Sequence, residues 1–228
     1  MPVIAAALFG SRARGDNEPD SDTDILFITC DKTPRHMVRD NLSISSYSSE
    51  YLTEKARSGD LFLCHIATEA KLLYDDANNF SRIVDAFTYK ASYEYEIRCA
   101  TELGTFLVHY GPEFTSALEV NRKIAWCVRT ILIAKSAEVR QPVFSPMALA
   151  GFASSQDVLQ LIRHRSNRRV SRAMLARFFD FLSHWGAPDV ERDKLQSEAY
   201  YRVFSSSDNK IGLQTYNKSW LEIDPSYL

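Results

Sequence analysis

The chain has 228 residues, of which 45% are hydrophobic and 25% charged. This is the composition of an ordinary globular protein, and it excludes fibrous and intrinsically disordered classes. The formal net charge of -2 gives no general attraction to nucleic acid or to an anionic membrane, so any affinity for phosphate groups must come from a local cluster.

The N-terminal run MPVIAAALFG is apolar, too short to span a membrane, and lacks the basic start of a signal peptide. We expect a buried strand at 2–9 and no membrane partner. The four cysteines, Cys30, Cys64, Cys99 and Cys127, are widely spaced, form no C-x-x-C pair and lie in or beside apolar stretches. This pattern predicts reduced core cysteines and a cytoplasmic location.

Two further strands are predicted at 22–29 and 41–48. The polar loop SRARGDNEPDS joins the first two strands and begins with a short helical turn near 11–14. From Glu50 onward the hydrophobic pattern has a helical period, which predicts helices at 50–59, 61–74, 91–110, 113–138, 156–163 and 171–185. In the longest, the predicted core stripe consists of Val120, Ile124, Cys127, Ile131 and Ala134.

The predicted fold is of the α/β (α+β) class. A small mixed β-sheet domain at 1–88 precedes an α-helical bundle at 89–228. The segment 205–210 is expected to interrupt any helix in the C-terminal part.

Asp22 and Asp24 are separated by one residue at the start of a predicted strand, so both carboxylates lie on one face. Two carboxylates this close repel each other unless a cation neutralises them. Hard oxygen ligands with open positions suit Mg²⁺, which completes its shell with water and substrate phosphates. The alternative is a solvated acidic turn, since acidic residues are common in loops before strands.

Gly10 and Ser11 offer an anion-binding turn, because glycine allows close backbone approach and the start of a helix presents free N–H groups. Arg12 either meets a phosphate or balances the acidic loop. Neither a G-x-x-x-x-G-K-[ST] nor a G-x-G-x-x-G motif occurs.

Taken together, LFGSRARGDNEPDSDTDILFI resembles the signature of the nucleotidyltransferase superfamily typified by DNA polymerase β, and in particular its minimal members. The resemblance implies transfer of a nucleoside monophosphate from an NTP, ATP first, to an acceptor hydroxyl on a protein, a tRNA or a small molecule, with release of pyrophosphate. Carried onto this sequence, Asp22 and Asp24 would be catalytic and bind Mg²⁺, while Gly10, Ser11 and Arg12 would contact the nucleotide. By analogy with family helical bundles, Lys123 would also contact the triphosphate.

Active members often carry a third carboxylate on the next strand, where this chain reads NLSISSYS. Asp40 and Glu50 flank that strand and are the candidates to replace it. The alternative is a degenerate member that keeps the fold or Mg-NTP affinity and acts as a partner or antitoxin in a toxin-antitoxin or defence system.

Basic residues gather late in the chain, in Arg163, Arg165, Arg168, Arg169 and Arg172. A solvated helical face is the default interpretation, and contact with RNA or polyphosphate is the alternative. A weaker third hypothesis is a ribonuclease that uses Arg177 and His184, whose spacing loosely fits the HEPN motif. His36, His65 and His109 have no partners at metal-ligand spacing and are expected to be structural.

Overall fold

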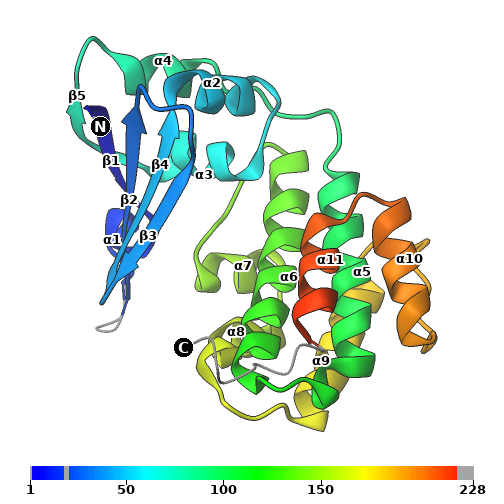
Figure 1. The fold of residues 1–228 in the computed structure, drawn as a ribbon. Coiled ribbons are helices and arrows are strands. Elements are labelled where there is room, and N and C mark those ends of the chain that lie inside the picture. Colours follow the sequence, from blue (N-terminus) through cyan, green and yellow to red (C-terminus); the bar gives the residue numbers. More distant parts are fainter. Residues whose placement is uncertain (1, 18–20, 220–228) are drawn as a thin grey trace, which may run out of the picture. The chain divides into compact units, whose positions relative to one another are not determined.

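The computed structural model describes residues 2–17 and 21–219 (Figure 1). The chain divides into two compact units. The first contains Met1–Ala91 and Ala137–Ser145, and the second contains Ser92–Ser136 and Pro146–Leu228. The chain therefore leaves the first unit after Ala91 and comes back to it for one short segment.

The first unit is built on a five-stranded sheet with the order β3-β4-β2-β1-β5. Its strands are β1 (Val3–Phe9), β2 (Thr23–Thr29), β3 (Arg35–Arg39), β4 (Leu42–Ser48) and β5 (Lys71–Asp75). β2 and β4 are parallel, and the other neighbouring pairs are antiparallel. The mixed sheet followed by helices confirms the predicted fold class.

Helices cover one face of this sheet. Ala5 and Ala7 of β1 and Leu26 and Ile28 of β2 are fully buried in one hydrophobic cluster. The cluster is completed by apolar side chains of α2 (Ser49–Arg57), α3 (Leu61–Glu69) and α4 (Asn79–Asp85). Because side chains alternate along a strand, Asp24 has the same parity as Leu26 and Ile28 and lies at the end of this covered face.

Local signals fix where two of these helices begin. The Ser48 hydroxyl accepts a hydrogen bond from the Tyr51 N–H at 3.1 Å, and the Asp60 carboxylate accepts one from the Phe62 N–H at 2.9 Å. Such side-chain caps satisfy the free N–H groups of a first turn and are worth about 1 kcal/mol each. They place α2 directly after β4, as the sequence pattern predicts.

The predicted helix at 61–74 was wrong at its C-terminal end. α3 stops at Glu69, Ala70 is extended, and β5 follows and pairs with β1. Leu72 stands four residues after Thr68, which imitates helical spacing, but it is 47% exposed on an edge strand. Pairing with β1 decides the conformation here, which a local pattern does not reveal. β3, whose five residues are all exposed, was not predicted.

The second unit is helical. Its elements are α5 (Glu94–Tyr110), η1 (Gly111–Glu113), most of α6 (Ala117–Glu138), α7 (Pro146–Phe152), α8 (Gln156–Arg163), η2 (His164–Ser166), α9 (Arg172–Trp185), α10 (Ser197–Ser206) and α11 (Lys210–Ser219). The predicted stripe on α6 is confirmed, since each of its five members is at most 1% exposed. The predicted interruption at 205–210 corresponds to the break between α10 and α11.

Three of the four cysteines, Cys64, Cys99 and Cys127, are buried. The prediction was wrong for Cys30, which is exposed because it follows the last residue of β2. Among residues 2–17 and 21–219, no helix combines the length and apolar character needed to cross a bilayer.

Candidate functional site

The candidate site lies where β1 ends and β2 begins. Phe9, the last residue of β1, pairs with Asp24, the second residue of β2. Gly10 follows at once with φ +75°, and a Cβ added to it would lie 2.6 Å from the Asp24 Oδ2. The Asp24 carboxylate therefore rests against the glycine backbone, and only glycine leaves it that space. Gly10 and Asp24, fourteen positions apart, are brought together as the fold predicts.

Ser11 and Arg12 belong to α1 (Gly10–Arg14), the single helical turn that follows. Ser11 is half-buried, and its carbonyl accepts the Gly15 N–H at 2.9 Å, which closes the turn. The Arg12 Nη2 donates to the Ser21 carbonyl at 2.9 Å, so this side chain spans the loop to the residue before Asp22. Its Nε is buried without a hydrogen-bond partner in the described part of the chain.

Asp22 and Asp24 differ in environment. Asp22 is exposed just before β2, while Asp24 is half-buried within it. Asp22 stands one residue before β2, so the alternation of the strand fixes the face of Asp24, and a shared face for Asp22 stays a prediction. Two carboxylates, a backbone turn and a serine form a donor set of hard oxygens and N–H groups, which fits a Mg²⁺ ion that shares its shell with phosphates.

A third carboxylate does not face Asp24 from β4. Ser43 pairs with Asp24 in the parallel register, and the hydroxyl of Ser45, next on the same face, lies 3.2 Å from the His36 Nδ1. Within residues 2–17 and 21–219, no group of three or more His, Cys, Asp or Glu side chains is placed to hold a metal ion.

The two flanking candidates lie at opposite ends of β4. Glu50 follows Ser48, which pairs with Thr29, so it is separated from the Ser43 level by at least five residues, about 16 Å at about 3.3 Å per residue. Asp40 is in the turn between β3 and β4, with φ 53°, at the end where Leu42 pairs with Thr23. Only Asp40 therefore lies at the same end of the sheet as Asp22.

Behind the turn, α1 is fastened to α3 by a largely buried charge network. The Arg14 Nη1 donates to the Glu69 Oε2 at 2.8 Å, and the His65 Nε2 lies 2.9 Å from the same oxygen. The three side chains are only 15–16% exposed. Arg14 also pairs with Asp16 at 3.1 Å. Sequence analysis missed this network, although the i, i+4 spacing of His65 and Glu69 on one helix is a signal that could have found half of it.

The network changes the titration of both its charged ends. Burial alone would raise the pKa of the Glu69 carboxyl, but hydrogen bonds from His65 and Arg14 outweigh burial and lower it. Burial would likewise lower the pKa of Arg14, but hydrogen bonds to Glu69 and Asp16 raise it. Glu69 and Arg14 are therefore ionised together at neutral pH.

Aromatic rings enclose the histidine of this network. The His65 ring is stacked on Phe144, with centroids 4.5 Å apart, and is edge-on to Phe9 at 5.8 Å. Phe144 is 1% exposed and belongs to the segment Ala137–Ser145 that rejoins the first unit. His65 thus has a structural role, and Phe9 links it to the turn that begins at Gly10.

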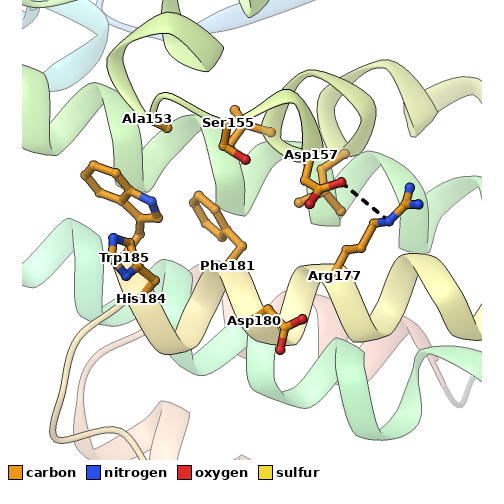
Figure 2. Close-up of a pocket in the computed structure, with 10 residues that line it drawn as sticks. Ala153, Ser155, Asp157, Arg177, Asp180, Phe181, His184 and Trp185 are labelled. Carbon is orange, nitrogen blue, oxygen red and sulfur yellow. Dashed lines mark ion pairs between the residues drawn. The ribbon is translucent and has the colours of Figure 1, made fainter.

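The remaining predicted residues are in the helical unit. Lys123 is half-buried on α6, and its role stays a prediction. Arg177 and His184 both line a pocket of about 280 Å³ formed by α8, α9 and the turn between α7 and α8. Figure 2 shows them at opposite ends of the pocket, with Phe181 between them. Arg177 is held by Asp157 at 3.4 Å, and this pair accounts for the arginine without a catalytic role.

Residues 1–98 match the family model described as "Nucleotidyltransferase domain". The N-terminal part of the chain is a nucleotidyltransferase domain. This confirms the resemblance seen in the sequence and assigns the domain to a family of transferases. Its matched range contains Gly10, Ser11, Asp22 and Asp24.

Among solved structures, the chain is similar to a nucleotidyltransferase-like protein from Exiguobacterium sibiricum 255-15, with 11% sequence identity and a TM-score of 0.32. The similarity covers 80% of this chain and 68% of that one. No curated protein matches the chain.

Proposed function

We propose that the nucleotidyltransferase domain transfers a nucleoside monophosphate from Mg-bound NTP, with ATP as the first candidate, to a hydroxyl of a protein, tRNA or small-molecule acceptor. The observation that carries the proposal is the contact geometry between Gly10 and Asp24. It sets an anion-binding turn directly against a carboxylate, which is what a metal-bound triphosphate requires.

In this proposal each residue has a limited task. Asp22 and Asp24 would hold Mg²⁺, which would neutralise phosphate charge and make the phosphorus more open to attack. The Gly10–Ser11 turn orients the triphosphate through backbone N–H groups and the serine hydroxyl. The acceptor oxygen forms a bond to the α-phosphorus as the bond to the bridging oxygen of pyrophosphate breaks. The acceptor proton passes to solvent, because no described carboxylate opposite Asp24 serves as a base.

Two further assignments complete the proposal. Residues 1–88 carry the nucleotide chemistry, while residues 89–228, with Lys123, carry triphosphate contact and acceptor recognition. The cytosol is the proposed compartment, supported by the exposed free thiol of Cys30, which a reducing environment preserves.

A second function, a binding module without turnover, is favoured by Ser43 and Ser45. These serines occupy the face of β4 from which a third carboxylate would reach the metal. Two aspartates and the phosphates themselves supply most of the coordination, so Mg-NTP affinity survives the loss of one ligand. Such a protein would act on a partner, as an antitoxin does, through its nucleotide-bound form.

Transfer is tested by incubating the protein in cell extract with Mg²⁺ and each NTP labelled at the α-phosphate. Label is expected in protein, tRNA or a small molecule from the α-labelled but not from a γ-labelled NTP, because pyrophosphate leaves. The Asp22→Ala plus Asp24→Ala variant should lose it. Glu54→Ala plus Asp85→Ala removes the same charge from exposed helix positions and should keep it.

Mg-ATP binding by calorimetry separates the two functions. Binding without transfer from any NTP would reject the enzyme and support the binding module. Absence of Mg-NTP binding by the intact chain would reject both.

A further inference from the structure

The strongest concentration of positive charge lies between α8 and α9, in the segment RHRSNRRVSR at 163–172, here called the basic loop. It contains five arginines and no acidic residue, in a chain whose net charge is -2. All five, Arg163, Arg165, Arg168, Arg169 and Arg172, are exposed. Like charges this close repel one another, so the cluster lowers the stability of the fold while it is unbound.

Most of the cluster has no charge partner within the described part of the protein. Arg165, Arg168, Arg169 and Arg172 make no ion pair there. Elsewhere in the same unit, Arg98 pairs with Asp189 and Glu94, and Arg122 pairs with Glu119, whereas the exposed Arg202 makes no described ion pair. The basic loop differs in that it gathers four such unpaired guanidinium groups between Arg165 and Arg172.

The basic loop is nevertheless held in a defined conformation. Asn121 of α6 is 2% exposed, and its Nδ2 donates to the carbonyls of Asn167 at 2.9 Å and Arg169 at 3.1 Å. Asn167 in turn accepts the Arg169 N–H at 2.8 Å through its side chain, and its own N–H donates to the His164 carbonyl at 2.9 Å. A buried amide thus fixes the backbone that carries the arginines. Pre-ordering lowers the entropy cost of binding.

We propose that the basic loop binds the phosphate backbone of a nucleic acid. Guanidinium groups match phosphate oxygens with paired, charge-assisted hydrogen bonds, which favours arginine over lysine for this ligand. A membrane surface fits less well, because the large apolar side chains that are exposed in this protein include none from the basic loop and Val170 is half-buried. The proposal does not depend on nucleotidyl transfer.

Binding is measured by fluorescence anisotropy on a labelled single-stranded RNA and on the DNA of the same sequence, in EDTA so that a Mg-dependent site does not contribute. The logarithm of the affinity should fall linearly with the logarithm of salt concentration, with a slope of about -3 for four phosphate contacts. Preference for RNA or DNA identifies the natural source of the backbone, and either one supports the proposal.

Matched variants locate the site. Arg168→Ala plus Arg169→Ala should weaken binding about tenfold or more and reduce the slope by about 0.7 per arginine. Arg57→Ala plus Arg202→Ala removes the same charge from exposed positions on α2 and α10 and should leave affinity within about twofold of the intact chain. An equal loss of affinity in the two double variants would overturn the proposal, since binding would then depend only on net charge.

Asn121→Ala tests the role of the pinned backbone. It keeps every arginine, so the salt slope should stay while the affinity falls severalfold, with circular dichroism and the Tm reporting that the unit is folded. Failure of the intact chain to bind RNA or DNA at low salt would overturn the proposal. So would binding to inorganic polyphosphate alone, or tighter binding to vesicles of anionic phospholipid than to either nucleic acid.

Discussion

The two sides of the candidate site are built differently. On one side, the turn at Gly10 is fastened through Arg14 to a largely buried ion pair with Glu69 and to His65. On the other, β4 presents Ser43 opposite Asp24, with no charge. Buried charges destabilise a protein unless they are paired, and on the first side the paired charges hold the turn in place. Under the proposed function, this contrast separates nucleotide binding from turnover, and it supports binding more than turnover.

The largest effect is expected from Gly10→Ala. Its Cβ would meet the Asp24 Oδ2 at 2.6 Å, and the carboxylate, as the free end of a side chain, would turn away. We expect loss of Mg-ATP binding in calorimetry, together with about 1–3 kcal/mol of strain from φ +75°. Gly15→Ala is the control, because it has φ +82° but nothing within 4 Å of the added Cβ. Retained binding in Gly10→Ala would show that Mg-ATP binding does not depend on the close contact between Gly10 and Asp24.

Glu69→Gln breaks the ion pair with Arg14 that holds the turn at Gly10. At neutral pH it should lower the free energy of unfolding by about 1–3 kcal/mol, since Arg14 and His65 lose a charged acceptor. Urea denaturation of both proteins against pH measures it.

The pKa of Glu69 is lowered from 4.5 in the folded protein, so its contribution is complete above about pH 4.5 and is lost as pH falls through the lowered value. The two proteins should therefore converge in acid. Exposed Glu54→Gln should change stability by less than about 0.5 kcal/mol at any pH. A constant difference between Glu69→Gln and the intact chain would contradict this account.

Ser43→Asp would add the carboxylate that β4 lacks opposite Asp24. A carboxylate opposite Asp24 should repel it without metal and share Mg²⁺ with it, so the Tm should fall in EDTA and rise on adding Mg²⁺. We expect Mg-ATP affinity to increase about tenfold, which is about 1.4 kcal/mol. Leu42→Asp places the same charge next to it on the opposite face and should give no Mg-dependent rise. An unchanged response in Ser43→Asp would show that β4 does not face the ion.

The smallest effect is expected from Arg12→Ala. The loss of its hydrogen bond to the Ser21 carbonyl should cost about 1 kcal/mol in thermal unfolding. If Arg12 only anchors the loop, the free energy of Mg-ATP binding measured by calorimetry should change by no more than about 1 kcal/mol. A tenfold weaker affinity, about 1.4 kcal/mol, would assign it to the triphosphate as well.

Local patterns predicted β1 and β2 from apolar runs bounded by Gly10 and Asp22, and they predicted β4 from the alternation of its residues after Asp40. β3 was not predicted, since a strand whose five residues are all exposed has no burial pattern in the sequence. β5 was assigned to a helix, because its strand conformation comes from pairing with residues more than sixty positions earlier.

In the site too, contacts between neighbouring elements can be predicted from the sequence, and long-range contacts cannot. The sequence predicts that Gly10 and Asp24 meet, because the strands that carry them are neighbours in the chain. It does not predict that Arg14 reaches Glu69, because that contact spans 55 positions and depends on how α3 packs. Nor does it place Phe144 on His65, since a segment far along the chain must first return to the first unit.

That return has a practical consequence for where the domain can be cut. The family match ends at residue 98, yet the ring that stacks on His65 comes from 137–145. A fragment ending at the family boundary would leave His65 half uncovered and the Arg14–Glu69 pair closer to water. The compact unit that carries the nucleotidyltransferase domain is therefore discontinuous in the sequence, and a fragment that keeps the Phe144 ring on His65 must extend to residue 145.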